Sequence, residues 1–407
     1  MDPIPVPAAA EDTPAPGRWR ALGWLGTAML LAMTTWFSAT AVVPQLTVQW
    51  NLSALQGSWL TIAVQLGFVA GALLSAGLTL ADVLSPRRLM LLGAIGAAAA
   101  NLVLLVVDGA TGAIIARFAT GAFLAGVYPP AMKAMASWFR RDRGLALGVM
   151  VGALTLGSAM PHLVNALGGA DWRVVIVVTS VLTVGGGLIA EFVVRDGPFR
   201  FPTVPFEPRQ LLVVVRDREV RLASIGYFGH MWELYAMWAW IGVFYATSFE
   251  AAGTGLSVVA ASTAAFATIG VGAAGCVVGG RLADRHGRAW LTSLSMVLSG
   301  LSAVTIGLLW SGPVLPLVLL GLFWGFWIVA DSAQFSTVVT EVADQRYVGT
   351  AVTLQLAFGF VLTVATIWLI PLLAELVGWR WAFVVLAGGP LLGTVAMLRL
   401  RATSAVR

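Results

Sequence analysis

The sequence predicts an all-α integral membrane protein in which twelve transmembrane helices form two pseudo-symmetric six-helix bundles. Three observations lead to this fold class: the composition, the recurring apolar runs and an internal repeat. Of the 407 residues, 59% are hydrophobic and 11% are charged, and the mean hydropathy is +0.88. Soluble domains usually contain about 25% charged residues, so the composition excludes a soluble globular protein.

Twelve apolar runs follow one another along the chain, and each is long enough to cross a hydrocarbon core of about 30 Å as a helix. They span 21–46, 54–80, 89–107, 112–137, 145–167, 173–194, 221–248, 256–281, 289–311, 314–340, 349–374 and 381–400. The first run is too long for the apolar core of a cleaved secretory peptide. We therefore expect a cytoplasmic tail at 1–20, an N-terminal bundle at 21–194, a cytoplasmic linker at 195–220, a C-terminal bundle at 221–400 and a cytoplasmic tail at 401–407.

Four short landmarks recur in the two halves at nearly constant spacing. The matching pairs are Leu52-Ser53 with Leu256-Ser257, Asp82 with Asp284, Gly144 with Gly349, and Trp172-Arg173 with Trp379-Arg380. Parallel duplication of six-helix halves is a transporter architecture, in which the substrate site is expected between the halves near the midplane.

Basic residues are distributed unevenly between the loops. The chain has 24 Lys and Arg residues and a formal net charge of +5. Most of them fall on alternate loops, whereas Arg173 and Arg380 lie on the other side and Arg117 and Lys133 lie inside apolar runs. This asymmetry is typical of the positive-inside bias rather than of a nucleic-acid-binding surface. It predicts an integral protein of the cell membrane, in bacteria the inner membrane, with both termini in the cytoplasm.

Five short stretches resemble the motifs of one transporter family. The stretch GRLADRHGR (280–288) is similar to the signature loop that the major facilitator superfamily carries between its second and third helices and again between its eighth and ninth. The other stretches are LTLADVLSPRR (78–88), RFATG (117–121), WFRRDRGLALG (138–148) and GWRWAF (378–383). The resemblance covers essentially the whole chain and implies a transporter of this superfamily.

The two loop motifs are expected to form a cytoplasmic gate. A carboxylate at the N-terminus of a neighbouring helix is favoured by about 0.3–1 kcal/mol. We therefore expect Asp284 to face the helix start near Gly349, and Asp82 to face the helix start near Gly144. The adjacent arginines would bridge to acids of the other half when the cytoplasmic side closes: Arg87, Arg88, Arg285 and Arg288. The alternative is a solvated turn that follows the positive-inside bias.

Charged residues inside transmembrane runs are costly and are therefore functional candidates. In GYFGHMWELYAMWAW (226–240), Tyr227, His230 and Trp238 share one helical face, given 3.6 residues per turn. Glu233 lies at the edge of this face, three residues from His230. We expect Glu233 and His230 to pair and to carry a proton. The alternative is a neutral pair with a structural role.

Two other runs supply further candidates. In WGFWIVADSAQF (324–335), Trp327, Asp331 and Gln334 share one face, and an acid beside aromatic rings suits a proton or a cationic group. The alternative for the tryptophans is ordinary membrane packing. In the fourth run, Arg117 shares a face with Tyr128. The resemblance implies that Arg117 takes part in coupling or substrate binding, and the alternative is an anchor that is hydrogen-bonded to neighbouring helix backbones.

Other classes of membrane protein lack support in the sequence. An ATP-driven pump needs a Gly-Lys-Ser/Thr loop, but the single lysine, Lys133, precedes Ala134. A zinc protease motif needs a His-Glu pair, and no histidine of this chain precedes a glutamate. We therefore expect no enzyme, no metal site and no cofactor. The expected partners are a small-molecule substrate, protons and the lipid bilayer, with a functional monomer and no nucleic acid.

The placement of the intramembrane charges predicts a secondary active transporter. Glu233, His230 and Asp331 lie in the C-terminal half, whereas Arg117 lies in the N-terminal half. Opposite charges across a central cavity suit a carboxylate or zwitterion, moved by alternating access and coupled to protons. The alternative is a proton-coupled multidrug or metabolite exporter, in which tryptophans and Asp331 supply an aromatic and acidic cavity.

Overall fold

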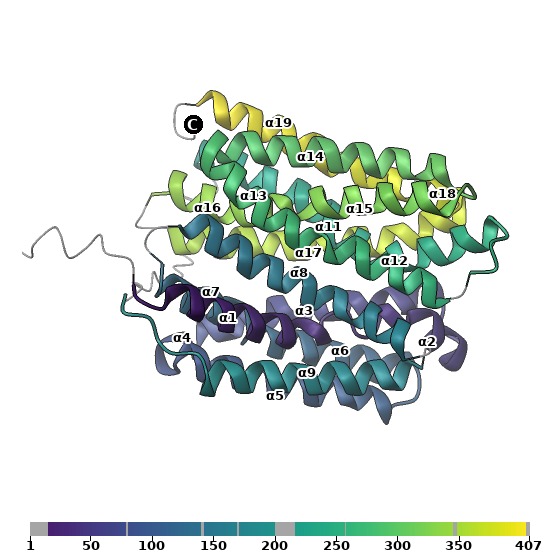
Figure 1. The fold of residues 1–407 in the computed structure, drawn as a ribbon, viewed down its shortest axis with the longest axis horizontal. Helices are drawn as coiled ribbons and strands as arrows, with labels where there is room; N and C mark the ends of the chain where they lie inside the picture. Colours follow the sequence, from purple (N-terminus) through teal and green to yellow (C-terminus); the bar gives the residue numbers. More distant parts are fainter. Residues whose placement is uncertain are drawn as a thin grey trace, which may run out of the picture.

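The computed structural model describes residues 15–78, 80–139, 142–168, 171–199, 216–256, 258–344 and 348–403, without the side chains of Ala81 and Asp82. Most of the predicted tail at 1–20 and of the linker at 195–220 falls outside these residues, as does the end of the tail at 401–407. The described residues form helices joined by short connections (Figure 1). The all-α fold class is therefore confirmed.

The helices of the two halves lie side by side along one long axis (Figure 1). In the N-terminal half they are α1 (Arg18–Ala32), α2 (Val43–Trp50), α3 (Ala54–Gly77), α4 (Leu80–Val83), α5 (Pro86–Leu102), α6 (Ala110–Leu124), α7 (Tyr128–Ala136), α8 (Arg143–Leu167) and α9 (Trp172–Phe192). In the C-terminal half they are α11 (Arg218–Ala251), α12 (Val258–Gly270), α13 (Gly272–His286), α14 (Arg288–Thr305), α15 (Val314–Ala330), α16 (Ser332–Val342), α17 (Val348–Val377), α18 (Trp379–Ala382) and α19 (Gly388–Ala402).

The structure supports ten or eleven of the twelve predicted spans by length and composition. Within the described residues, ten helical segments are long and apolar enough to cross a membrane. The first predicted span makes an eleventh if its two parts, which meet at a 47° bend, are counted together. The remaining run, at 221–248, is α11, which is long enough but less apolar because it holds His230, Glu233 and several Tyr and Trp residues.

Several spans are interrupted near their middle. The first passes from α1 through short 3-10 segments, Met33–Thr35 and Thr40–Val42, into α2. α12 gives way to α13 after Gly270, and α15 gives way to α16 at Asp331. An interruption frees backbone carbonyl and N–H groups at membrane depth, where other protein groups must satisfy them. The breaks therefore mark the places where buried polar side chains are needed.

Local sequence determines where individual helices begin. Ser53 opens α3 with a capping box: its hydroxyl accepts a hydrogen bond from Gln56 N at 3.2 Å, and the Gln56 side chain accepts one from Ser53 N at 2.9 Å. This reciprocal pairing satisfies two N–H groups that the first turn leaves free. Ser257, the counterpart of Ser53 in the repeat, lies outside the described residues.

The two halves meet along two sets of helices. α8 packs against α12 and α13, and α3 packs against α17 (Figure 1). Glycines bring α8 and α13 to backbone contact: a Cβ atom on Gly148 would lie 2.6 Å from the carbonyl oxygen of Cys276, and one on Gly280 would lie 2.9 Å from that of Gly144. Small residues allow helices to approach this closely in lipid. The α8–α13 seam is thus largely backbone against backbone.

Two neighbouring glycines on α9 provide a matched test of close helix packing. A Cβ atom on Gly186 would lie 2.5 Å from the carbonyl oxygen of Ala28 in α1, whereas nothing lies within 4 Å of one on Gly185. Gly186→Val should lower the melting temperature of the purified protein by several degrees, because overpacking costs about 1–3 kcal/mol. Gly185→Val should leave it nearly unchanged. Equal melting temperatures for the two variants would contradict the close α1–α9 contact.

Candidate functional site

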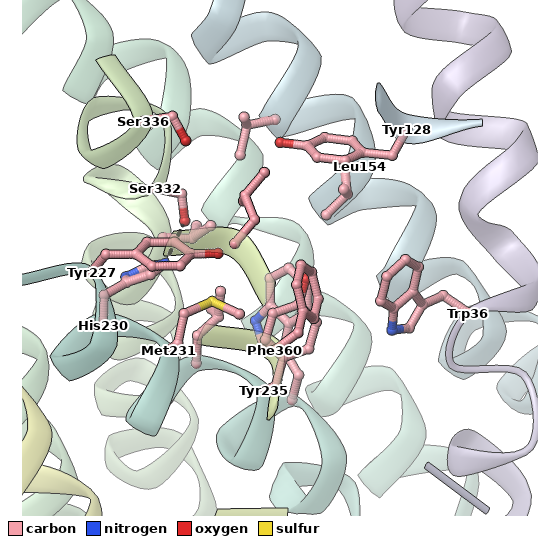
Figure 2. A pocket seen from close by; sticks show the side chains of 15 residues that line it. Trp36, Tyr128, Leu154, Tyr227, His230, Met231, Tyr235, Ser332, Ser336 and Phe360 are labelled. Carbon is pink, nitrogen blue, oxygen red and sulfur yellow. Dashed lines mark hydrogen bonds between the residues drawn. The ribbon is translucent and has the colours of Figure 1, made fainter. Parts of the chain in front are cut away.

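A small cavity lies between the two halves at the level of the helix breaks. Its volume is about 50 Å³. Figure 2 shows Tyr227, His230, Ser332 and Ser336 on one side of the cavity and Trp36 on the other. The lining is mostly aromatic and aliphatic: Trp36, Tyr128, Val151 and Leu154 come from the N-terminal half, and Tyr227, His230, Met231, Leu234, Tyr235, Trp238, Val329, Ser332, Ser336, Leu356 and Phe360 come from the C-terminal half.

An aromatic cluster joins the halves beside this cavity. Its members are Trp36, Phe37 and Phe68 from the N-terminal half and Tyr235, Trp238 and Phe360 from the C-terminal half. The ring centroids of Phe68 and Phe360 lie 4.8 Å apart, and the ring of Phe37 stacks on that of Tyr235 at 6.1 Å. Aromatic pairs at such distances contribute about 0.5–1.5 kcal/mol beyond the burial of their surfaces. The cluster thus holds the halves together at the centre of the molecule.

His230 connects the cavity to an acid at a helix break. Its Nδ1 lies 3.0 Å from Oδ1 of Asp331, the residue between α15 and α16. On the other side of the ring, Nε2 lies 2.8 Å from the hydroxyl of Ser332. His230 is 3% exposed and Asp331 is 1% exposed, so the pair is shielded from the surface while His230 and Ser332 line the cavity. A buried imidazole beside a carboxylate is an arrangement that can hold and release a proton.

Glu233 does not pair with His230, and that prediction is wrong. The two carboxylate oxygens of Glu233 accept hydrogen bonds from Ser299 Oγ and from Trp324 Nε1, both at 2.7 Å. Side chains three residues apart point about 60° apart around a helix, so they can contact different neighbouring helices. Glu233 faces α14 and α15, whereas His230 faces the break before α16. Glu233 is not among the residues that line the cavity.

Arg117 is fully buried in the N-terminal half and does not line the cavity. Its guanidinium donates hydrogen bonds to carbonyls at the break of the first span and in α3, and to two polar side chains. The acceptors are Thr35 O (3.0 Å), Trp36 O, Leu60 O (3.3 Å), Ser38 Oγ (3.0 Å) and Asn101 Oδ1 (2.9 Å). This geometry favours the anchor alternative over direct contact with a substrate.

The remaining predicted residues divide between the cavity and other surroundings. Tyr128, Tyr227 and Trp238 line the cavity. Trp327 is partly buried and packs its ring against Phe326 of the same helix. The prediction treated 324–335 as one continuous helix, but the interruption at Asp331 changes the direction of the side chains that follow it.

Gln334, in the first turn of α16, contacts Arg288 and does not line the cavity. Its side-chain oxygen accepts a hydrogen bond from Arg288 Nη1 at 2.6 Å. Arg288 Nε also donates to Glu341 at 2.7 Å, so this arginine forms hydrogen bonds with two residues of α16. One end of the bundle carries the loop between α13 and α14, the loop after α16 and both described termini. We call it the basic end.

Asp284 contacts the other half of the protein, but not at the predicted helix. A Cβ atom on Gly144, the second residue of α8, would lie 2.6 Å from Asp284 Oδ1. The carboxylate therefore faces the N-terminus of α8 instead of the start of α17 near Gly349. The reason is the pairing of the halves, in which α13 meets α8 and α3 meets α17. The side chain of Asp82 lies outside the described residues.

The arginines next to the loop acids do not bridge the halves as predicted. Arg87 donates to both carboxylate oxygens of Asp196, at 3.0 Å each, within the N-terminal half. Arg288 binds Glu341 within the C-terminal half. Each arginine thus stabilises the basic end of its own bundle. The other two predicted gate arginines are exposed: Arg88 and Arg285.

A second contact between the halves lies beyond the cavity, away from the basic end. Asn165 Nδ2 in α8 donates to Ser262 Oγ in α12 at 2.9 Å and to the carbonyl of Ala41 at 3.2 Å. One turn earlier, the ring of His162 lies 3.2 Å from where a Cβ atom on Gly242 of α11 would stand. Contacts between the halves therefore bound the cavity on both sides along the long axis.

Sequence reasoning missed the uncharged polar residues of the site. It considered charges inside the spans, whereas Ser299, Ser332 and Asn101 complete the networks around those charges. The signal available was the small polar residue inside an apolar run, which is weak because serine and threonine also bond to their own helix backbone. Within the described residues, no three His, Cys, Asp or Glu side chains are grouped to hold a metal ion.

The sequence matches one known family over nearly its whole length. The Major Facilitator Superfamily matches residues 25–271 and 223–406, which together span nearly the whole chain. The chain belongs to this family. The all-α architecture and the central cavity between two halves are thus those of a membrane transporter.

Individual relatives are more distant. The puromycin resistance protein pur8 of Streptomyces alboniger is 30% identical over 178 residues, which are 42% of this chain and 34% of that protein. The chain therefore matches about a third of the length of this curated relative. A bacterial homolog of the human lysosomal transporter Spinster, in an inward-facing and occupied conformation, superposes with a TM-score of 0.72 at 15% identity, over 96% of this chain and 98% of that one. The same homolog in an unoccupied conformation gives 0.65 at 16% identity, over 95% and 96%. These structural likenesses concern the fold.

Replacing Arg117 tests whether this residue is a structural anchor or a contact for the substrate. Arg117→Met removes the donors that satisfy three carbonyls and should destabilise the protein by about 3 kcal/mol or more, because several buried acceptors lose their partners. The measurement is the melting temperature of the purified protein. Arg173→Met, at an exposed position, is the control and should change it little. An unchanged melting temperature in Arg117→Met would contradict the anchor.

Proposed function

We propose that this protein is a proton-coupled secondary transporter that moves an amphipathic, largely aromatic organic solute by alternating access. The observation that carries the solute class is the lining of the cavity. It combines aromatic and aliphatic side chains with hydroxyl groups and one imidazole, and its described members include no acid, arginine or lysine. Sites for drug-sized organic molecules are mostly apolar with a few placed polar groups. The aromatic part of this lining supports the exporter alternative, whereas the acid expected in that cavity, Asp331, lies behind His230 and is not in the lining.

A carboxylate or zwitterion is less well suited to this cavity than the sequence indicated. Such a solute needs a positive charge at the binding site, and the predicted charge was Arg117. The guanidinium of Arg117 is instead occupied by carbonyls and side chains of the N-terminal half. The one basic group in the lining, His230, is already paired with Asp331.

His230 and Asp331 are our candidates for the proton-carrying pair. His230 contacts the cavity directly, and Asp331 lies behind it at 3.0 Å. A proton that enters from the cavity reaches His230 first, and the carboxylate of Asp331 stabilises the resulting imidazolium. Since the pair borders the solute space, the binding of a solute changes the surroundings of His230 and so couples the solute to the proton.

Opening of the cavity requires one set of contacts between the halves to break at a time. We place the basic end in the cytoplasm because of the positive-inside bias. Opening to that side separates Asp284 from the N-terminus of α8, and opening to the other side separates Asn165 from Ser262. Each contact joins α8 to the span formed by α12 and α13, so the two contacts act at opposite ends of one helix pair.

Puromycin is the first test solute, because the partly matching relative is named for resistance to it. Cells that express this protein should tolerate more puromycin than cells with an empty vector, and proteoliposomes with an imposed pH gradient should move radiolabelled puromycin against its concentration gradient. A protonophore should abolish this movement. Transport of small organic acids without any transport of puromycin or other aromatic amphiphiles would contradict the solute class.

A matched pair of variants tests the assignment of the proton site. Asp331→Asn should reduce gradient-driven accumulation about tenfold or more, while solute exchange without a gradient continues. Glu233→Gln replaces a carboxyl group that is buried away from the cavity lining and should keep most of the gradient-driven transport. Full coupling in Asp331→Asn together with lost coupling in Glu233→Gln would show that the proton site had been assigned to the wrong acid.

A further inference from the structure

We infer that Ser332 transmits the protonation state of His230 to the solute, because it offers its hydroxyl hydrogen to the cavity only after His230 and Asp331 together have taken up a proton. This inference rests on the proposed function and deepens it. It names the residue that links the proton to the solute and the solute group that this residue binds. Ser332 is the first residue of α16 and lines the cavity.

Ser332 stands at a helix break on the cavity wall. Asp331 separates α15 from α16, so Ser332 begins a new helix. Figure 2 shows Ser332 and Ser336 on the same side of the cavity, as expected for residues four apart on one helix. Ser332 is partly buried, and its hydroxyl is within reach of both the imidazole of His230 and the solute space.

The hydroxyl of Ser332 has one hydrogen-bond partner among the described residues, and that partner is His230. Its Oγ lies 2.8 Å from Nε2 of His230, and Nδ1 of the same ring lies 3.0 Å from Oδ1 of Asp331. Serines inside helices often bond to a carbonyl of their own helix, as Ser293 does with that of Ala289 at 2.7 Å. Ser332 instead ends a chain of contacts that runs from a buried carboxylate through an imidazole to the cavity.

The direction of the hydrogen bond between Ser332 and His230 depends on the number of protons that the imidazole and the carboxylate hold. A neutral imidazole has one N–H group and one acceptor nitrogen. When Asp331 is ionised, its carboxylate keeps the ring proton on Nδ1, so Nε2 accepts the hydrogen of the Ser332 hydroxyl. The hydroxyl then presents only its lone pairs to the cavity.

One added proton reverses this hydrogen bond. If the ring takes the proton, Nε2 becomes a donor. If Asp331 takes it, the carboxyl group donates to Nδ1 and the ring hydrogen resides on Nε2. In both cases Nε2–H donates to Ser332 Oγ, and the hydroxyl hydrogen of Ser332 becomes available to the cavity. The outcome is therefore the same wherever the added proton resides.

The solute group that responds to this change is a hydrogen-bond acceptor, such as a carbonyl, an ether or a ring nitrogen. It meets only lone pairs before the proton arrives and a donor afterwards, so it binds together with the proton. An ammonium group responds in the opposite sense, because the neutral imidazole and the ionised carboxylate carry a net negative charge that the added proton removes.

Three tyrosines and one acid are the other titratable groups of this region. The ring centroid of Tyr227 lies 6.3 Å from that of His230, and Tyr128 and Tyr235 line the same cavity. Tyrosine ordinarily titrates at about pH 10, so these hydroxyls keep their protons below about pH 8. Glu233 faces α14 and α15 rather than the cavity.

The elements packed around α11 carry their titratable side chains elsewhere. α12 and α15 contain none, and His162 of α8 stands beside Gly242, about three turns along α11 from His230. Cys276 of α13 donates to the carbonyl of Val329 at 3.4 Å. The titratable residues of α16, α17, α18 and α19 lie near the ends of the bundle: Glu341, Glu375, Arg380, Arg399 and Arg401.

The test uses two neutral aromatic probes of similar shape. Benzophenone has a carbonyl that accepts hydrogen bonds, whereas diphenylmethane has no acceptor, and neither probe titrates. In thermal-shift titrations the wild type should bind benzophenone about tenfold more tightly at about pH 5 than at about pH 8, the range in which histidine ordinarily changes charge. The affinity for diphenylmethane should not change with pH in this way.

Three variants assign the pH dependence to one hydroxyl. Ser332→Ala should remove the pH dependence of benzophenone binding, because Nε2 of His230 then has no hydroxyl through which to act. Ser336→Ala, at the other serine of the same wall, is the matched control and should keep the pH dependence. Ser332→Thr retains a hydroxyl at the same position and should keep it as well, which separates loss of the hydroxyl from damage to the fold.

An unchanged pH dependence in Ser332→Ala would overturn the inference. A wild-type affinity for benzophenone that does not change with pH, or no binding at either pH, would overturn it as well. The proposed function is judged separately by the puromycin flux assay. A protein that moves puromycin but binds benzophenone equally at both pH values keeps the proposed function and loses the role of Ser332. A protein in which Ser332→Ala alone removes the pH dependence, but which shows no proton-driven flux, keeps that role and loses the proposed transport.

Discussion

The organisation of the site depends on one constraint: a helix that breaks inside the membrane must have its freed carbonyls satisfied by other protein groups. At the break of the first span this is done by Arg117, whose guanidinium donates to the carbonyls of Thr35 and Trp36 and, in α3, to that of Leu60. The same arginine is held by Asn101. The break directs Trp36 towards the cavity, so an arginine that is remote from the solute space determines the shape of that space.

The interior of the membrane has a low dielectric constant, so buried charged side chains need partners. In this protein most of those partners are other protein groups. Glu233 is satisfied by Ser299 and Trp324, and Arg117 is satisfied by carbonyls. Asp331 is close to His230, which alone among these groups lines the cavity. The solute space is therefore nearly free of fixed charge even though charged residues surround it. The proton coupling that we propose through His230 would require only a local change at one wall of the cavity.

The sequence was sufficient for the fold class, the family and the approximate position of each span, because apolar runs and loop motifs are local features. Candidate residues were also found locally, and Tyr128, Tyr227, His230 and Trp238 line the cavity. Their partners were not predictable. Whether Glu233 faces His230 or α14 depends on how helices distant in sequence are arranged, and the interruption at Asp331 shifts every face derived from a continuous helix. The contact of Asp284 with α8 likewise depends on the pairing of the halves.

The glycine seam between α8 and α13 has a mechanical consequence. Gly148 and Gly152 recur at four-residue spacing and lie against the backbone of the facing helix, next to the carbonyls of Cys276 and Ala273. Few side chains therefore interlock along this part of the contact between α8 and α13. Such a surface adds little steric hindrance to a movement of one helix along the other. In the proposed alternating-access cycle, the specific contacts between α8 and the span of α12 and α13 are then the polar ones at its ends, chiefly Asp284 at one end and Asn165 at the other.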